Sequence, residues 1–281
     1  MREINVSQIT DVVEKLCIEA NQHLPEDVKC AIKNCRACED GEIAQGVLDK
    51  IIENYEIADA QCVPICQDTG MAVLFVKYGD KVVIEDGSFK TAVENGVRQA
   101  YKEGYLRKSV VNDPVFDRIN TKDNTPAIIH TEIVPGDKIS IVAGGKGFGS
   151  ENMSAIKMIT PSYGVQGVID FVLDTVRTAG PNPCPPMVVG VGIGGTFEKA
   201  AQLAKKATFR AINTSNPDPR YAEMEEQLLE QINKMGFGPA GLGGTTTALG
   251  VNIETYPTHI AGMPVAVNIC CHAARHKSAT I

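Results

Sequence analysis

Three of the nine cysteines lie where regular secondary structure is not expected. Cys66 occurs in VPICQDTG, Cys184 in GPNPCPP and Cys271 in NICCHAARH. Proline and glycine favour irregular backbone, which can aim side chains at a common point. Thiolates on separate rigid supports could bind three irons of a [4Fe–4S] cluster and leave the fourth iron open as a Lewis acid. On spacing alone, three buried thiols without a metal remain an open alternative.

Other cysteines fit a structural role better. Cys30, Cys35 and Cys38 have the C-x4-C-x2-C spacing of a plant-type ferredoxin. Their segment has a helical composition, however, and on a helix the side chains of Cys30 and Cys35 point about 140° apart. They therefore cannot converge on one cluster, and we expect them to serve packing. The same holds for Cys17, which lies in an amphipathic helical pattern.

Two glycine-rich segments each follow an expected strand and precede an expected helix. Gly144–Asn152 would offer backbone N–H groups and a helix N-terminus to an anion, but it lacks the GK[ST] ending of a phosphate-binding loop. Gly190, Gly192 and Gly195 have the GxGxxG spacing of dinucleotide-binding folds. Since no strand ending in an acidic residue follows about twenty residues later, we interpret this second motif as a packing turn.

Composition excludes several classes of protein. The chain has 281 residues, of which 43% are hydrophobic and 22% charged, so wholesale disorder is not expected. A net charge of −7 and only 5% aromatic residues argue against a nucleic-acid partner. We find neither an apolar run of membrane-spanning length nor a secretory signal, and therefore expect a cytoplasmic protein without a membrane partner. An odd number of cysteines in such a protein argues against a disulfide framework.

The candidate residues must be positioned by helices and strands that alternate along the chain. Helical periodicity and start signals predict helices over residues 6–20 (with Ser7 as N-cap), 26–39, 42–58, 88–105, 151–159, 165–178, 197–209 and 221–235. Runs of β-branched residues bounded by turn residues predict strands over 71–77, 81–85, 127–134, 138–143, 187–193, 248–253 and 264–269. A Gly-Asp turn between the first two strands predicts a hairpin.

This order of elements predicts an α/β (α+β) fold with a mixed sheet. We expect one functional domain over residues 1–281. Within it, residues 1–60 should form a helical layer, and residues 61–281 should form a mixed α/β part that carries the candidate cysteines.

Several motifs resemble, in order and spacing, the alpha subunit (the N-terminal half of the one-chain enzymes) of class I iron–sulfur hydro-lyases. These are the oxygen-sensitive fumarate hydratases and the similar L-tartrate dehydratases. The resemblance covers almost the whole chain. It rests on PICQDTG (64–70), LRKSVVNDPVFDRINTKDNTPAIIH (106–130), KGFGSENMS (146–154), CPP (184–186), GIGGT (192–196) and THIAGMPVAVN with CHAAR (258–275).

The resemblance implies a set of site residues. It makes Cys66, Cys184 and Cys271 the cluster ligands, although Cys270 is an additional cysteine beside the last of them. It places substrate contacts at Gln67, Asp68, Arg107, Gly149, Asn152, Lys157 and His259, with Lys146 as an alternative to Lys157. Asp68 and His259 become the catalytic candidates, and His259 is the better one for proton transfer because imidazole titrates near neutral pH.

The resemblance also implies an activity and partners. The activity is the reversible hydration of fumarate to L-malate, a step of the tricarboxylic acid cycle, with the open cluster iron as Lewis acid. The expected partners are a small dicarboxylate substrate and a beta subunit that supplies the catalytic base, with an alpha–alpha dimer inside a heterotetramer. This chain alone should therefore bind the cluster but have little activity.

Three alternatives remain. The first is the dehydration of L-tartrate to oxaloacetate, because tartrate differs from malate by one hydroxyl group. The second is a non-catalytic iron–sulfur electron carrier that uses Cys30, Cys35 and Cys38. The third is a nucleotide-binding enzyme built on Gly190–Gly195. They predict activity on tartrate, reversible one-electron reduction and NAD binding, respectively.

Overall fold

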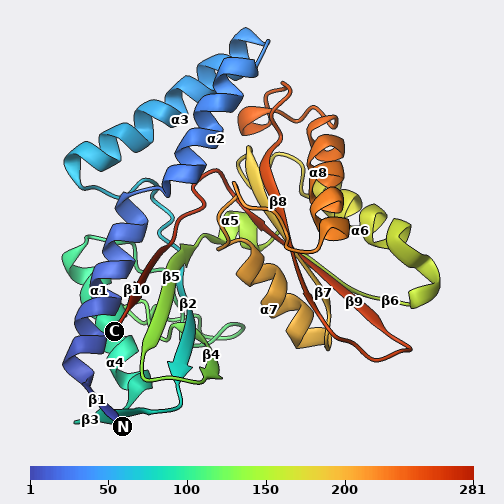
Figure 1. Ribbon diagram of the computed structural model, residues 1–281. Coiled ribbons are helices and arrows are strands. Elements are labelled where there is room, and N and C mark those ends of the chain that lie inside the picture. The colour runs from blue at the N-terminus through green and yellow to red at the C-terminus, as the bar shows by residue number, and fades with distance from the viewer. The chain divides into compact units, whose positions relative to one another are not determined.

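A computed structural model describes all 281 residues, and the chain divides into two compact units (Figure 1). Unit 1 comprises Met1–Pro25, Asn54–Phe148 and Arg275–Ile281, and unit 2 comprises Glu26–Glu53 and Gly149–Ala274. The expected subdomains, 1–60 and 61–281, do not coincide with these units, because the first sixty residues contribute to both. Each unit is assembled from segments that are distant in sequence.

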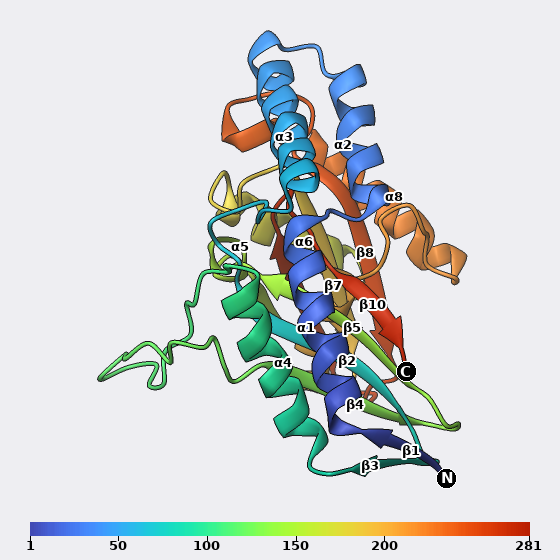
Figure 2. The same ribbon diagram turned by 90° about the vertical axis from the view of Figure 1, so that its left-hand side faces the viewer.

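Unit 1 is a four-stranded sheet with two helices, α1 (Val6–Gln22) and α4 (Phe89–Glu103), packed on one face (Figure 2). The strands follow the order β10 (Lys277–Thr280), β5 (Ile139–Lys146), β2 (Met71–Gly79), β4 (Ile128–Val134). β2 is parallel to β4 and antiparallel to β5, so the sheet is mixed, as expected. Leu74 of β2 and Ile141 of β5 are fully buried under the helices.

The N-terminal cap of α1 differs from the expectation. Asn5 is the cap instead of Ser7: the Asn5 side chain accepts a hydrogen bond from the backbone N–H of Ser7 at 2.9 Å. The Asn5 N–H in turn donates to the side chain of Gln8 at 3.1 Å. This reciprocal arrangement is a capping box, which satisfies N–H groups that the helix leaves unbonded.

The hairpin expected about the Gly-Asp turn is absent. β3 (Val82–Glu85) instead pairs in parallel with β1 (Arg2–Asn5), a strand that we did not predict. The turn is bonded elsewhere, because the N–H of Gly79 donates to the carbonyl of Lys138 at 2.9 Å. β4 and β5 are not paired with each other either, since β2 lies between them.

Unit 2 contains a second mixed sheet, covered by helices on both faces (Figure 1). The strands follow the order β6 (Ala155–Ile159), β9 (Met263–Cys270), β7 (Met187–Gly194), β8 (Ala248–Tyr256). The helices are α6 (Gly164–Ala179) and α8 (Pro219–Asn233) on one face and α7 (Phe197–Ala207) on the other. Every residue of β7 is buried, as expected for a central strand between two helical layers.

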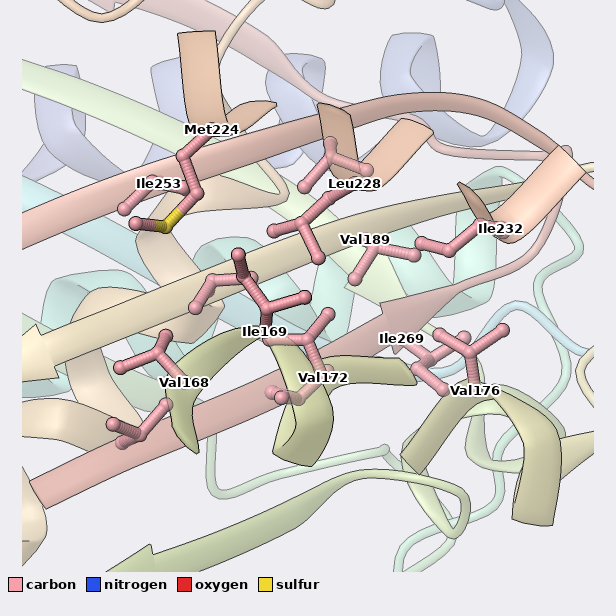
Figure 3. Close-up of a cluster of buried hydrophobic side chains, with 14 of the residues drawn as sticks. Val168, Ile169, Val172, Val176, Val189, Met224, Leu228, Ile232, Ile253 and Ile269 are labelled. Carbon is pink, nitrogen blue, oxygen red and sulfur yellow. The ribbon is translucent and has the colours of Figure 1, made fainter. Parts of the chain in front are cut away.

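Figure 3 shows the core of unit 2 between the sheet and the helices α6 and α8. Ile169 and Val172 of α6 and Leu228 of α8 meet Val189 of β7 and Ile269 of β9. The helical residues recur every three or four positions and the strand residues every second position, which is how each element presents one apolar face. The packed sheet is thus a firm base for the loops at its ends.

Gly190 and Gly192 lie on the other face of β7, against α7. A Cβ atom at Gly190 would stand 2.2 Å from the carbonyl oxygen of Ala204, and one at Gly192 would stand 2.1 Å from that of Ala200. Only glycine allows the helix to approach so closely. This confirms the interpretation of the GxGxxG segment as a packing motif.

The helix predicted over residues 151–159 is wrong. α5 (Phe148–Glu151) is a single turn, and the following residues form β6, with Ala155 opposite Val267 of β9. Pairing with a strand distant in sequence overrides the local pattern here. The glycine-rich segment before it consequently opens one turn of helix and offers no extended helix N-terminus to an anion.

The remaining elements agree closely with the sequence. α2 (Glu26–Cys38) and α3 (Glu42–Gln61) are continuous helices at the predicted places. The sequence did not indicate β10, nor the short 3-10 turns η1 (Pro161–Tyr163) and η2 (Pro239–Gly241). None of the helices combines the length and the apolar character needed to cross a membrane.

Candidate functional site

In unit 1, the segment Cys66–Gly70 connects the end of α3 to β2. Cys66 is half-buried, and its thiol donates a hydrogen bond to the side-chain oxygen of Gln67 at 3.2 Å. Gln67 is exposed and Asp68 is half-buried. Three consecutive residues of the sequence prediction therefore lie on irregular backbone with their side chains accessible.

Asp68 is held in one orientation. Its carboxylate accepts hydrogen bonds from the N–H of Gly70 at 3.0 Å and from the N–H of Phe148 at 2.9 Å. Its backbone carbonyl accepts a further bond from the guanidinium of Arg275. The glycine-rich segment Gly144–Asn152 was expected to donate N–H groups to an external anion, but the N–H of Phe148 is bonded to Asp68 of the chain itself.

Arg107 lies beside the same segment. The hydroxyl of Thr69 donates to the carbonyl oxygen of Arg107 at 3.0 Å, which joins the two predicted substrate-contact segments. The guanidinium of Arg107 is exposed and makes no hydrogen bond within the chain. It is therefore available to a carboxylate, which it could bind in a two-pronged geometry.

In unit 2, Cys184 and Cys271 come from neighbouring stretches of backbone. The ring Nδ1 of His272 lies 3.0 Å from the carbonyl oxygen of Cys184, so Nδ1 carries the proton of this hydrogen bond. The backbone N–H of His272 points at the same oxygen at 3.5 Å. Cys184 is exposed and Cys271 half-buried, whereas Cys270 is buried inside β9 opposite Val188. This environment favours Cys271 over Cys270 as the accessible thiol.

The turn that contains Gly149 and Asn152 is attached to the same end of β9. The side-chain N–H2 of Asn268 donates to the carboxylate of Glu151 at 2.9 Å and to the hydroxyl of Ser154 at 2.9 Å. Gly149 and Asn152 are both exposed on this turn. Unit 2 thus brings four of the predicted residues to one end of its sheet.

Lys157 and His259 do not join this group. Lys157 lies on β6 opposite Val265, and its ammonium stands 5.9 Å from the ring centre of Phe171. Val265 is six residues before Cys271, which corresponds to about 20 Å along a strand. Lys146, the alternative, is buried at the end of β5 and donates to the carbonyl of Gly147 at 3.3 Å.

His259 lies at the opposite end of β9 from Cys271. It borders a cavity of about 460 Å³ whose other walls come from the ends of β7 and β8 and the start of α7. Thr258 beside it donates to the carbonyl of Gly195 at 2.9 Å. The length of β9 separates His259 from Cys271 by about 25 Å, so this side chain does not reach the two cysteines of its own chain.

The remaining cysteine patterns carry no site. Cys30, Cys35 and Cys38 lie on the continuous helix α2, as predicted, so Cys30 points about 140° away from Cys35. Within either unit, no group of three or more His, Cys, Asp or Glu side chains is arranged to hold a metal ion.

The donor set nevertheless fits an iron–sulfur cluster. All nine cysteines are free thiols, and the three candidates lie on non-helical backbone with partial or full exposure. Thiolate is the usual ligand of such clusters. Cys184 and Cys271 belong to unit 2, and Cys66 belongs to unit 1.

Sequence reasoning assigned no role to two residues that hold these segments. His272 is bonded to the backbone of Cys184, and Arg275 to the backbone of Asp68. Both belong to the CHAAR segment at the end of β9. Their position next to a candidate ligand was the available signal.

Comparison with known proteins agrees with these observations. The family described as fumarate hydratase (Fumerase) matches residues 10–280. A protein of Methanocaldococcus jannaschii, provisionally named L(+)-tartrate dehydratase subunit alpha, is 44% identical in an alignment of 278 positions that covers 95% of each chain.

Bacterial relatives extend the match. The L(+)-tartrate dehydratase subunit alpha of Escherichia coli (strain UTI89) is 33% identical over 274 residues, covering 96% of this chain and 89% of its own. The protein of the same name from Shigella sonnei is 32% identical over an equal length. These matches confirm the resemblance that the motifs indicated, and the chain belongs to the fumarate hydratase (Fumerase) family.

Proposed function

We propose that the chain is the alpha subunit of a [4Fe–4S]-dependent hydro-lyase that interconverts fumarate and L-malate. The observation that carries this proposal is the family match over residues 10–280, together with the adjacency of Cys184 and Cys271 at one end of the sheet of unit 2. The chain is accordingly an enzyme subunit that removes or adds water.

Cys66, Cys184 and Cys271 are the proposed cluster ligands. Their support is the chemistry of the donor set, since they are accessible thiols on backbone that is not helical. When bound, the cluster supplies an open iron that acts as a Lewis acid on the hydroxyl group to be removed. Because hydroxide is a poor leaving group, dehydration needs such assistance.

The neighbours of Cys66 are proposed to bind and orient the dicarboxylate. Arg107 offers an unbonded guanidinium, which is suited to one carboxylate. Gln67 offers an amide, and Asp68 is fixed by two N–H donors and so provides a rigid acceptor. Local positive charge is needed because the chain as a whole carries −7 and repels a dianion at long range.

Gly149 and Asn152 are proposed to contact substrate from the turn beside Cys271. Lys157 is less suited, since its ammonium lies over Phe171 on β6. We retain Lys146 as the alternative. Replacing each lysine by Met and measuring KM for malate separates them: the contact residue raises KM at least about tenfold, and the other leaves it unchanged.

For His259 we propose a role between copies of the chain. It lies about 25 Å from Cys271 of its own chain along β9, which is much longer than a four-carbon substrate. A proton-transfer role for His259 therefore requires the site of a second copy, in line with an alpha–alpha dimer inside a heterotetramer. His259 then works at the cluster of its partner copy.

Mixing inactive variants tests this arrangement. His259→Ala and Cys184→Ala enzymes are each expected to be inactive, and a mixed dimer contains one site with neither substitution. Since random pairing makes about half of the dimers mixed, co-expression of the two should recover about a quarter of wild-type activity. Activity no higher than that of the separate variants would contradict a role of His259 at the site of a second copy.

The beta subunit is the remaining partner. The relatives described above are named as alpha subunits, which implies a second kind of subunit in those enzymes. We propose that this chain likewise binds its cluster alone but turns over substrate only with a cytoplasmic beta partner. Full activity of the purified chain without any partner would contradict this.

Reconstitution tests the proposed function itself. The chain is purified without oxygen, reconstituted with iron and sulfide, and analysed for iron while the thiolate absorption band near ~400 nm is followed. We expect about four irons per chain and a change of the spectrum when malate is added. A folded chain that takes up no iron, alone or with its beta subunit, would contradict the proposal.

L-Tartrate is the second candidate substrate, with oxaloacetate as product. The observation in its favour is the name shared by relatives at 32–44% identity over at least 95% of this chain. Since one hydroxyl distinguishes the substrates, a polar contact that is left unpaired with malate would favour tartrate strongly. The ratio of kcat/KM for L-malate and L-tartrate, measured on the complete enzyme, decides between them.

A further inference from the structure

Arg275 is a buried cation without an anionic partner. It opens the last segment of unit 1, and only 6% of its surface is exposed. Its guanidinium donates one hydrogen bond, to the backbone carbonyl of Asp68. It forms no ion pair, and its Nε atom is buried without any acceptor. Burying a charge in this state is costly and is rare in proteins.

The surroundings of Arg275 do not require a charge. The carbonyl oxygens of Thr69 and Gly70, which follow Asp68, each lie 2.9 Å from the neutral hydroxyl of Tyr101 and share its one proton. The neutral amide of Asn124 donates to the Gly70 carbonyl as well, at 3.1 Å. Neutral donors thus hold the same loop next to Arg275. A purely structural bond to the Asp68 carbonyl could be made by such a donor too.

The charge of Arg275 affects the neighbouring hydroxyl of Tyr101. Burial raises the pKa of the Tyr101 hydroxyl, and Arg275 acts on it in the opposite direction. The nearest carboxylate of the loop, that of Asp68, is bonded to the N–H groups of Gly70 and Phe148. No carboxylate of the chain therefore forms an ion pair with the guanidinium of Arg275.

We propose that Arg275 is a positioning residue for the Cys66–Asp68 segment, and that its charge stabilises the anionic thiolate-ligated iron–sulfur group which this segment helps to hold. The inference rests on the proposed function. Arg275 acts through the loop: its hydrogen bond fixes the backbone of Asp68, two residues after Cys66. Its positive charge offsets the negative charge that thiolate ligation brings. The observation behind the proposal is that the guanidinium is buried without an anion, with an Nε atom that has no acceptor.

Two substitutions separate the charge from the hydrogen bond. Arg275→Lys keeps the charge and loses the planar fork, and Arg275→Gln loses the charge and keeps an N–H donor. Arg98→Gln is the matched control, because it removes an arginine from unit 1 that is paired with Asp123 at 2.9 Å on the surface. Each variant is reconstituted without oxygen, and the rate of iron loss to a chelator is measured. The melting temperature of the cluster-free chain is the second readout.

We expect Arg275→Gln to lose iron about ten to a hundred times faster than wild type, which is the usual effect of removing a group that supports a metal ligand. Arg275→Lys should stay within about threefold of wild type, and Arg98→Gln should match it. The cluster-free chain should not melt earlier in Arg275→Gln, because the substitution removes an uncompensated buried charge. In the complete enzyme, kcat should fall with the iron content while KM is unchanged.

Three results would overturn the inference. Equal iron retention in Arg275→Gln and wild type would show that the charge is not used. Equal losses in both Arg275 variants, with an earlier melting of the cluster-free chain, would show a structural role alone. A raised KM with unchanged iron retention would assign the charge to the substrate carboxylate. A wild-type chain that takes up no iron would instead contradict the proposed function, and this inference with it.

Discussion

Helix α2 and the irregular segments of unit 2 differ in how they direct their cysteine side chains. Cys30, Cys35 and Cys38 are close in sequence and share one helix, yet the helix turns Cys30 about 140° away from Cys35. Cys184 and Cys271 are far apart in sequence, yet their backbones are joined through His272. Close spacing along a helix therefore does not by itself direct thiols to one point, whereas a contact between segments that are distant in sequence can bring two cysteines together.

Burial raises the pKa of two cysteines that lie on helices. Burial raises the pKa of Cys35, and Cys17 on α1 is affected more strongly, with a pKa of about 12. A thiol that stays protonated is a poor metal ligand, because the thiolate is the form that binds. Cys184 is exposed instead and sits at a left-handed backbone position, with φ of 55°.

Substituting the two sets of cysteines should give the largest difference. Cys66→Ala, Cys184→Ala and Cys271→Ala should each reduce the iron content of the reconstituted chain from about four to below one per chain. The combined variant Cys30→Ala, Cys35→Ala, Cys38→Ala is the matched control and should keep all of its iron. Iron lost from the helix variant and kept by the others would reverse the comparison.

Alkylation should grade the cysteines within helices. With a pKa of about 12, the thiol of Cys17 forms about a thousandfold less thiolate at pH 8 than an ordinary cysteine does. Cys30, exposed on α2, should react with iodoacetamide within minutes, while Cys17 reacts only on unfolding. Mass spectrometry of timed samples measures both. Rapid modification of Cys17 in the folded chain would show that α1 opens locally.

Much of this arrangement was readable from local sequence, because amphipathic helices and β-branched strands carry their own periodicity. Local sequence does not predict which distant segments pair as strands. The local pattern therefore predicts a helix where β6 lies and a hairpin of β2 with β3, because strand pairing depends on residues far away in the chain. The motifs of the sequence also contain Cys184 and Cys271, whose segments lie next to each other. The separation of His259 from Cys271 was not readable from the motifs, because it depends on the direction of β9.

The role of α2 is better explained by the residue after it. The carboxylate of Glu39 accepts hydrogen bonds from the N–H groups of Thr245 and Thr246 and from the Thr245 hydroxyl, at 3.0–3.1 Å. Burial alone would raise the pKa of Glu39, but these bonds outweigh it and hold the pKa below its usual value. The helix thus ties a glycine-rich loop of unit 2, instead of a cluster.

Breaking this tie should have the smallest of the three effects. Glu39→Gln should lower the free energy of unfolding by about 2 kcal/mol, measured by urea denaturation, and Asp40→Asn next to it should change nothing. Because the pKa of Glu39 is lowered in the folded state, its contribution is present above about pH 4.3 and is lost as the pH falls further. The wild type should therefore lose more stability than Glu39→Gln on acidification. An equal loss of stability in the wild type and in Glu39→Gln on acidification would show that the carboxylate of Glu39 does not stabilise the fold.

The position of β10 in the sequence affects the order in which the two units can fold during translation. β10 pairs with β5 at the edge of the sheet of unit 1, and Arg275 comes just before it. Unit 2 completes its own sheet with β9 and can begin to fold while the ribosome is still translating. Unit 1 keeps an open strand edge until residues 275–280 emerge. The loop of Cys66 thus acquires the hydrogen bond from Arg275 to Asp68 long after Cys66 itself has been synthesised.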